Sequence, residues 1–258
     1  MKEVEIIDIT PENISEYGVC GYKNANKHVE LRKKIDWVCE FYPKGLKIKA
    51  LISQKGGYQG MIEYIPGKYA HRPVDADGYL FIHCLFVGFN KEFKGKGYAT
   101  LLIDECINEA KKANLSGVAV VTRKGSFMAN NNIFLKNGFQ IVENAKPDFD
   151  LLVLKFDKDM KDPGFKLNLN EKIKEYNDGL TILRSAQCPY TEKNVNAIID
   201  SAIRMKLKTK LVDLQDVNAV QSNPCAFGTF CIIYNGKVIS HHPISKTRFE
   251  NIMSKISK

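Results

Sequence analysis

The sequence lacks any long apolar run. No stretch approaches the roughly 18 consecutive apolar residues that a membrane-spanning helix needs. The first ten residues, MKEVEIIDIT, carry acidic side chains in place of the apolar block of a secretory signal. We therefore expect a soluble, cytoplasmic protein with no membrane partner.

The sequence also lacks a CxxC motif. Its seven cysteines are an odd number scattered over 258 residues, which argues against a disulfide framework. Without paired cysteines a zinc ribbon is excluded as well, and we expect no metal site. His241 and His242 are adjacent, but no third ligand follows at a suitable spacing, so we expect them to mark the end of a strand.

A long basic block is absent too. The chain carries 38 lysines and arginines against 29 acidic residues, a net charge of +9. Such an excess suits an anionic partner, whether nucleic acid, a membrane surface or a small molecule. Because the lysines are spread evenly and arginines are few, we expect no nucleic-acid binding, and a solvated lysine-rich surface is the simplest explanation.

The length and composition favour two domains. The chain is 44% hydrophobic, which is enough for two ordinary cores at roughly 100 to 200 residues per domain. A polar stretch without clear periodicity contains Pro163 and Gly164, and we place a linker at 157–174. The expected domains are therefore 1–156 and 175–258.

The first domain reads as mixed α/β. Two alternating segments around Gly56 and Gly57 predict an antiparallel hairpin of half-buried strands. The apolar run YLFIHCLFV predicts a central strand, and the stripe that follows, which includes Cys106, predicts a buried helix face. In chain order we expect strands at 46–53, 58–65 and 79–87, a helix after residue 97, a strand at 116–122, a helix within 128–139 and a strand at 148–156.

The residue pattern of the second domain predicts a βαβ unit followed by a ββα unit. Asn235-Gly236 between two apolar runs is a strong hairpin signal. Thr247 and Glu250 have the spacing of a capping box at the start of the last helix. We expect strands at 179–185, 209–214, 229–234 and 237–241, with helices at 192–206 and 246–256. The fold class is thus α/β (α+β) in both halves.

A glycine-rich loop joins the central strand to the next helix. Glycines at such a place let the backbone approach a ligand, and the amides of a helix N-terminus favour phosphate oxygens. A P-loop is excluded because Lys96 is followed by Gly97 rather than by Ser or Thr. A Rossmann fingerprint is excluded because Thr100 stands where the third glycine belongs. A tight turn with solvated lysines remains the alternative.

Residues 94–99 of the loop, Lys-Gly-Lys-Gly-Tyr-Ala, follow the pattern [Q/R]-x-x-G-x-[G/A] with Lys94 at its first position. Together with the strand CLFV before it and the later FLKNGF, this loop resembles the GNAT superfamily of acyl-CoA-dependent N-acyltransferases. The resemblance implies an acyltransferase that moves an acetyl group from acetyl-CoA to an amine of a small molecule or peptide, and it allows a homodimer. It implies that the loop amides hold the pyrophosphate and that the strand end binds the pantetheine arm and thioester carbonyl. The cofactor-binding residues would be Leu85, Phe86, Val87, Lys94, Gly95, Lys96, Gly97, Tyr98 and Ala99.

The chain departs from the family pattern at two places. Lys94 replaces the usual Gln or Arg and stands seven positions after Val87, where five is more common, so we expect a longer or differently bent loop. Phe134 replaces the tyrosine that often protonates the leaving thiolate, so the general acid is unassigned. His83 and Glu63 are the candidate bases. A buried, hydrogen-bonded histidine and a solvent-facing glutamate are the structural alternatives.

The motif AQCPYT in the second domain resembles the site of glutaredoxins and thioredoxins, where a cysteine begins a helix. Cys188 would be that cysteine, but Thr191 replaces its partner and Gly228 stands where the fold has a cis-proline. A Cys188–Cys225 pair is a hypothesis that their separation would decide.

As a whole, the chain resembles the YoaP-type acetyltransferases. The expected function is acetyl transfer, with a C-terminal domain for recognition or thiol chemistry. A thiol-redox or thiol-binding protein that binds acyl-CoA without catalysis, and an adaptor that senses the cofactor without any chemistry, are the alternatives.

Overall fold

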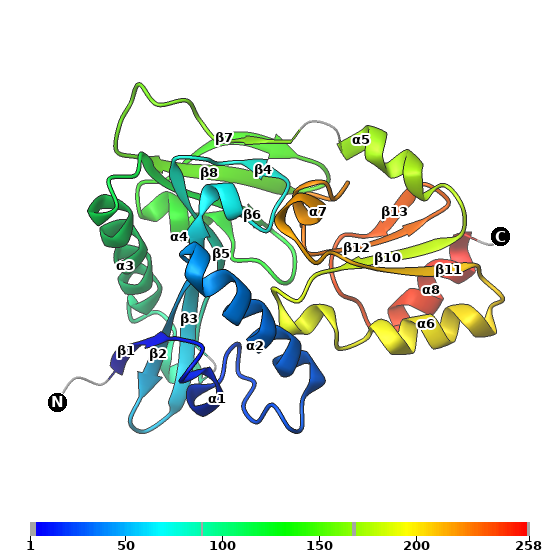
Figure 1. Cartoon of the computed structure of the whole chain (residues 1–258), viewed down its shortest axis with the longest axis horizontal. Coiled ribbons are helices and arrows are strands. Elements are labelled where there is room, and N and C mark those ends of the chain that lie inside the picture. Colours follow the sequence, from blue (N-terminus) through cyan, green and yellow to red (C-terminus); the bar gives the residue numbers. More distant parts are fainter. Residues whose placement is uncertain (1–3, 89, 167–168, 257–258) are drawn as a thin grey trace. The chain divides into compact units, whose positions relative to one another are not determined.

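The structure, a computed structural model, describes residues 4–88, 90–166 and 169–256. It forms two compact units, which are described separately (Figure 1). The first contains Met1–Ala70 and Val74–Phe165, and the second contains His71–Pro73 and Lys166–Lys258. Within the described ranges, no helix is both long and apolar enough to cross a membrane.

The first unit is built on a seven-stranded sheet in the order β1-β2-β3-β5-β6-β8-β7. All neighbours are antiparallel except β5 and β6, which run parallel. Its main strands are β1 (Val4–Ile9), β2 (Lys47–Ser53), β3 (Gly57–Pro66), β5 (Tyr79–Val87), β6 (Gly117–Arg123), β7 (Gln140–Ala145) and β8 (Phe149–Lys155). The expected hairpin and central strand are therefore present.

Helices cover this sheet. They are α1 (Ile14–Tyr17), α2 (Val29–Phe41), α3 (Tyr98–Lys112) and α4 (Asn131–Lys136). The apolar stripe of α3 packs on the sheet, and Cys106 in it is fully buried, as expected. The hairpin differs from expectation because β3 is buried on both faces rather than on one. The alternating sequence predicted one solvent-exposed face on β3. Glu63 on this strand is buried instead, where it contacts the buried Lys34 of α2.

Several short elements were not predicted. Strand β7 precedes β8, and a two-residue ladder joins β4 (Val74–Asp75) to β9 (Gly164–Phe165). The expected linker, 157–174, thus contains a strand, and also α5 (Leu169–Lys172), while its residues 167 and 168 lie outside the described residues. These segments are too short or too polar to show a period in the sequence.

The second unit has a four-stranded sheet in the order β11-β10-β12-β13. Its strands are β10 (Leu180–Arg184), β11 (Thr209–Asp213), β12 (Phe230–Tyr234) and β13 (Lys237–Ser240), with helices α6 (Val195–Arg204), α7 (Val217–Gln221) and α8 (Lys246–Ile256). Only β10 and β11 are parallel, which gives the expected βαβ and ββα order. The α/β (α+β) fold class is confirmed for the chain.

The start of α8 corrects one prediction. The helix begins at Lys246, so Thr247 lies inside it rather than at its cap. The hydroxyl of Ser245 accepts a hydrogen bond from the amide of Arg248 instead, at 3.2 Å. Glu250 accepts a hydrogen bond from Ser201 on α6, at 2.5 Å, and thereby ties the two helices together.

Candidate functional site

Strands β5 and β6 pair over only part of their length. Their register runs from Tyr79 opposite Gly117 to Ile82 opposite Val120, yet β5 continues to Val87. Beyond Ile82 the edge of β5 that faced β6 makes no further ladder with it. Backbone groups need hydrogen-bond partners, so this stretch of β5 offers amides and carbonyls to a ligand in extended conformation.

The glycine loop lies between β5 and α3. Gly95 and Gly97 have φ values of 75° and 80°, a region that favours glycine, and Gly97 is the N-cap of α3. A Cβ at either position would meet no atom within 4 Å. The space in front of both glycines is therefore open, and the amides at the start of a 15-residue helix lie beside it.

The strand end and the loop line one cavity of about 510 Å³. Eight of the nine residues that the resemblance implies for the cofactor line it, and Lys96 is the exception. Lys96 is exposed, with its ammonium 5.6 Å from the centre of the Phe93 ring. The cavity is completed by Phe93, Thr100, Ala129, Ile133 and Lys136. This volume falls within the range of small-molecule sites.

Gln59 anchors the segment that leads into the loop, and sequence reasoning missed it. Its side chain, fully buried on β3, donates to the carbonyl of Gly56 at 2.5 Å and accepts from the amide of Asn90 at 3.3 Å. The backbone carbonyl of Gln59 accepts a hydrogen bond from the amide of Gly88 at 2.8 Å. The longer loop expected here thus contains a 3-10 turn, Lys91–Phe93, while residue 89 lies outside the described residues.

The two candidate bases belong to one buried cluster. Oε1 of Glu63 lies 3.1 Å from Nδ1 of His83, and Oε2 lies 2.5 Å from Nζ of Lys34 on α2. All three side chains have no exposed surface. Glu63 is therefore not the solvent-facing residue considered as an alternative. Burial raises the pKa of its carboxyl, but the charge of Lys34 and the hydrogen bonds of His83 and Lys34 bring that pKa down to about 2.

A β-bulge sets the place of His83. Glu63 pairs with Cys84 and Tyr64 pairs with Ile82, so His83 is the extra residue on β5. Because an ionised carboxylate only accepts, Nδ1 of His83 donates the hydrogen bond to Glu63. Trp37 and Phe81 pack around the imidazole, with ring centres 6.0 Å and 5.8 Å away.

The cluster is not part of the cavity itself. Neither His83 nor Glu63 is among the described residues that line it, although His83 is two positions before Leu85 on the same strand. Phe134, which stands where a tyrosine acting as general acid was considered, is fully buried. Its ring packs edge to face on that of Phe139, with the ring centres 5.4 Å apart. Lys34 could have been suspected from the sequence, since it interrupts the apolar stripe of α2.

Cys188 does not begin an α-helix. It is the N-cap of a single 3-10 turn, Pro189–Thr191, and the α-helix starts only at Val195. The expectation that Cys188 begins a helix is therefore wrong, and the one short turn that follows it aligns few peptide dipoles. The hydroxyl of Thr191 donates to the carbonyl of Ser185 at 2.7 Å, so this residue holds the turn in place of a second thiol.

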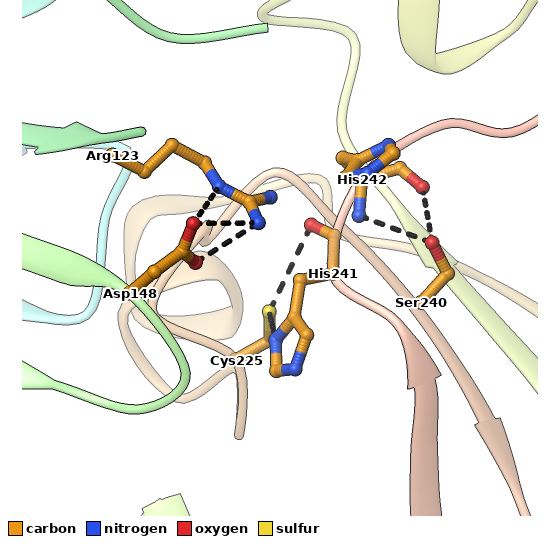
Figure 2. Close-up of polar contacts among 6 residues, drawn as sticks. All are labelled: Arg123, Asp148, Cys225, Ser240, His241 and His242. Atoms are coloured by element: carbon orange, nitrogen blue, oxygen red, sulfur yellow. Dashed lines mark hydrogen bonds and ion pairs between the residues drawn. The ribbon is translucent and has the colours of Figure 1, made fainter. Parts of the chain in front are cut away.

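Cys225 contacts a histidine that the sequence did not pair with it. Its sulfur lies 3.0 Å from Nδ1 of His241, which directly follows β13 (Figure 2). None of Cys188, Cys225 and Cys231 forms a disulfide, and Cys231 is buried inside β12. Within the described ranges, no group of three or more histidine, cysteine or acidic side chains is arranged to hold a metal. No spacing in the sequence signals the Cys225–His241 contact.

Figure 2 also draws an ion pair of the first unit. Arg123, the last residue of β6, contacts both carboxylate oxygens of Asp148, with the shortest distance 2.9 Å. Its guanidinium lies 5.0 Å from the centre of the Phe149 ring. This pair fixes the end of β6 against β8.

Comparison with known proteins places both halves of the chain. Residues 209–251 match the family described as YoaP-like. Over 255 residues the chain is 25% identical to the uncharacterized N-acetyltransferase YoaP of Bacillus subtilis (strain 168), which covers 97% of this chain and 99% of that protein. The resemblance to GNAT N-acetyltransferases with a YoaP-like C-terminal region is confirmed, and with it the acyltransferase class.

Solved structures were also found. A GNAT family acetyltransferase from Brucella melitensis, in complex with acetyl-CoA, is 17% identical and covers 63% of this chain and 95% of its own, with a TM-score of 0.38. The PaiA N-acetyltransferase from Thermoplasma acidophilum, in complex with coenzyme A, is 13% identical and covers 59% of this chain and 99% of its own, with a TM-score of 0.41.

Proposed function

We propose that this chain, which resembles the GNAT N-acetyltransferases with a YoaP-like C-terminal region, transfers an acetyl group from acetyl-CoA directly to an amine of a small molecule or peptide. One observation carries the proposal. The end of β5, beyond its ladder with β6, and the glycine loop before α3 meet in one cavity, which offers a strand edge and helix amides to the same ligand. We assign this reaction to domain 1–156 and recognition or thiol chemistry to domain 175–258.

The cavity has complementary ends for a long anionic ligand. Amides at Gly95, Gly97 and the first turn of α3 suit a pyrophosphate, because the helix dipole favours negative charge there. The side chains of Leu85 and Val87 are apolar, and the backbone between them suits the amides of a pantetheine arm. The net charge of +9 agrees with an anionic substrate.

In the proposed reaction the amine nitrogen attacks the thioester carbonyl carbon, and the carbon–sulfur bond then breaks. Backbone amides of β5 that hold the carbonyl would stabilise the oxyanion, a kind of interaction worth about 3 kcal/mol per donor. The thiolate can leave without an acid, because its conjugate thiol has a pKa near 8 to 9, so Phe134 does not prevent turnover.

We assign the base to His83 and an orienting role to Glu63. Glu63 stays ionised because of Lys34, and it fixes the imidazole with Nε2 as the proton acceptor. Since His83 is buried beside the cavity rather than in it, the proton reaches it through water, as general bases often accept protons.

Calorimetric titration of acetyl-CoA into the wild type and into Gly97→Trp tests the binding step. We expect micromolar affinity, about −8 kcal/mol, that the variant loses because the indole fills the open space before the loop. Gly236→Trp is the matched control, since Gly236 also has positive φ and no crowded neighbour but belongs to the second unit. No heat with the wild type, or equal binding by Gly97→Trp, contradicts the proposal.

The alternative function is a thiol-redox or thiol-binding protein that binds acyl-CoA without catalysis. The buried Phe134, which brings no hydroxyl to the site, favours it. A screen of amines with acetyl-CoA, read as release of free coenzyme A, separates the two functions. Binding without turnover on any amine supports the alternative.

A further inference from the structure

One wall of the proposed acetyl-CoA cavity is supplied by α4 and by Ala129, which precedes it. Ile133 and Lys136 both line the cavity, and their spacing along α4 places them on one face of the helix. Ala129 and Ile133 also pack against the core cluster that includes Leu85 of β5. Lys136, the last residue of α4, is exposed. This wall is therefore apolar where it meets the core and carries an ammonium group at its end.

The C-terminal end of α4 is tied to the first turn of α3. Nδ2 of Asn137, the C-cap of α4, donates a hydrogen bond to Oγ1 of Thr100 at 3.3 Å. Thr100 is the third residue of α3 and lines the cavity. The other end of α4 is held on β8, where Nδ2 of Asn131 donates to Oδ2 of Asp150 at 2.8 Å. Because Lys136 directly precedes Asn137, it lies at the end of the cavity where the helix amides suit a phosphate.

Lys94 and Lys136 are the cations among the described residues that line the cavity, and none of those residues is acidic. The stem of Lys94 lies against the segment before the loop, since a Cβ on Gly88 would be 2.4 Å from its Cγ. Lys96 does not line the cavity, and its ammonium is 5.6 Å from the ring centre of Phe93. Within the described ranges, Lys136 forms no ion pair with the protein. Its charge can therefore serve a ligand in the cavity.

Coenzyme A carries phosphate at two separate places. The pyrophosphate joins the pantetheine arm to the nucleoside, and a further phosphate is attached to the ribose at its 3′ position. With the pantetheine arm along β5 and the pyrophosphate at the loop amides, the nucleoside lies beyond those amides, on the side away from β5. A phosphate monoester has a charge of about −1.5 to −2 at pH 7 and three acceptor oxygens. An ammonium group such as that of Lys136 suits this charge.

We propose that Lys136 binds the 3′-phosphate of coenzyme A and thereby makes the site select coenzyme A over 3′-dephospho-coenzyme A. This inference rests on the proposed function, because the orientation of the cofactor in the cavity is taken from it. Acetyl-CoA and free coenzyme A carry the same ribose phosphate, so the preference applies to the substrate and to the product. Lys136 is thus a binding residue that determines which form of the cofactor is accepted, and it takes no part in the transfer itself.

The preference should be moderate and should depend on salt. Lys136 is exposed, and an ion pair in contact with water changes a dissociation constant by about fivefold at most. Because mobile ions screen such a pair, the ratio of the two affinities should fall as the ionic strength is raised from about 0.01 M to about 1 M. A preference that came from apolar contacts with the ribose would not fall in this way.

Calorimetric titration of coenzyme A and of 3′-dephospho-coenzyme A tests the proposal. We expect the wild type to bind coenzyme A about fivefold more tightly than the dephospho form. Lys136→Gln should bind both ligands with the affinity that the wild type has for the dephospho form, whereas Lys136→Arg should keep the preference because it keeps the charge. Lys112→Gln is the matched control, since Lys112 is an exposed lysine at the other end of α3, and it should behave as the wild type does.

Lys94→Gln distinguishes the two lysines of the cavity. Lys94 lies beside the loop, so its substitution should weaken the binding of both ligands by the same factor and leave their ratio unchanged. Circular dichroism establishes that each variant is folded.

Three results would overturn the inference. Equal affinities of the wild type for the two ligands would remove the selection itself. A full preference in Lys136→Gln, or a preference lost in Lys94→Gln in its place, would remove the assignment of Lys136. Failure of the wild type to bind either ligand would contradict the proposed function, and the inference would fall with it.

Discussion

Nζ of Lys34 lies 2.5 Å from Oε2 of Glu63, and neither side chain has any exposed surface. A buried ion pair contributes little net stability when intact, because both ions lose their hydration. Removing one partner is costly, however, because the other charge is left buried. Lys34 also lies 4.0 Å from the ring centre of Trp37, so the pair joins α2 to β3 and to the packing around His83.

Lys34→Met should destabilise the first unit strongly. The methionine fills similar volume but leaves the Glu63 carboxylate without its cation, and breaking a buried pair costs about 3–5 kcal/mol. Urea unfolding at neutral pH measures the loss. Lys44→Met is the matched control, because Lys44 pairs with Glu40 at the surface, and it should stay within about 0.5 kcal/mol of wild type. Equal effects of the two substitutions contradict this account.

The stability of the wild type should fall between about pH 4.5 and pH 2. The pKa of Glu63 is about 2 in the folded protein and near its ordinary 4.5 when unfolded, so the unfolded chain binds more protons in this window. The contribution is therefore complete above pH 4.5 and is lost as pH falls towards 2. Unfolding of wild type and Glu63→Gln over this range measures it. A difference that does not change with pH would show that Glu63 does not titrate in this way.

His83→Gln should lower kcat for acetyl transfer by about 10²–10⁴-fold, the usual contribution of a general base. Acetyl-CoA affinity should not change, because the side chain of His83 does not line the cavity. Steady-state kinetics with an accepted amine, combined with calorimetry, separates the two effects. His28→Gln is the control, since His28 is a partly exposed histidine of the same unit. An unchanged kcat in His83→Gln removes His83 as the base.

Gln59→Ala should weaken acetyl-CoA binding about tenfold, or about 1.4 kcal/mol. The truncation removes the hydrogen bond to the amide of Asn90 and thus loosens the segment that leads into the glycine loop. Calorimetry measures the affinity, and Gln54→Ala, an exposed glutamine in the same hairpin, is the control. If both variants bind like the wild type, the anchor does not organise the loop.

Gly228→Ala should destabilise the second unit more than Gly236→Ala. Both glycines have positive φ, 77° and 73°, so both substitutions carry the same backbone strain of about 1 kcal/mol. Only at Gly228 would the new Cβ lie 2.8 Å from Cα of Arg72 and 2.9 Å from the oxygen of His71. Thermal unfolding of the two variants therefore isolates the crowding. Equal losses would mean that the neighbouring segment moves aside without cost.

Sequence reasoning reached the parts of the fold that depend on local pattern. The hairpin, the central strand β5, helix α3 and the ββα end of the second unit all carry a period of two or 3.6, or a turn signal, that is visible in the residues. Sequence reasoning missed β7 and α7, which are short and half-polar. It also placed the N-cap of α8 two residues too late, because Thr247 and Glu250 have the spacing of a capping box by coincidence.

The candidate site divides in the same way. The glycine loop could be found because a motif of adjacent residues sets it. The partners of Glu63, Gln59 and Cys225 could not, because each contact joins residues 16 to 31 positions apart and depends on how elements pack. The length of the β5–β6 ladder, which decides where a ligand can pair with the backbone, is likewise a property of the folded sheet.

The early end of the β5–β6 ladder has a consequence for how such a protein can diversify. A ligand that pairs with main-chain amides is held by groups that every amino acid except proline supplies. In the proposed complex with acetyl-CoA, substitutions at Leu85, Phe86 or Val87 would therefore change the space beside the thioester, and with it the size of the acyl group accepted, while the backbone contacts to the cofactor stay in place. The first half of β5, buried in the sheet at Leu80 and Ile82, has no such freedom.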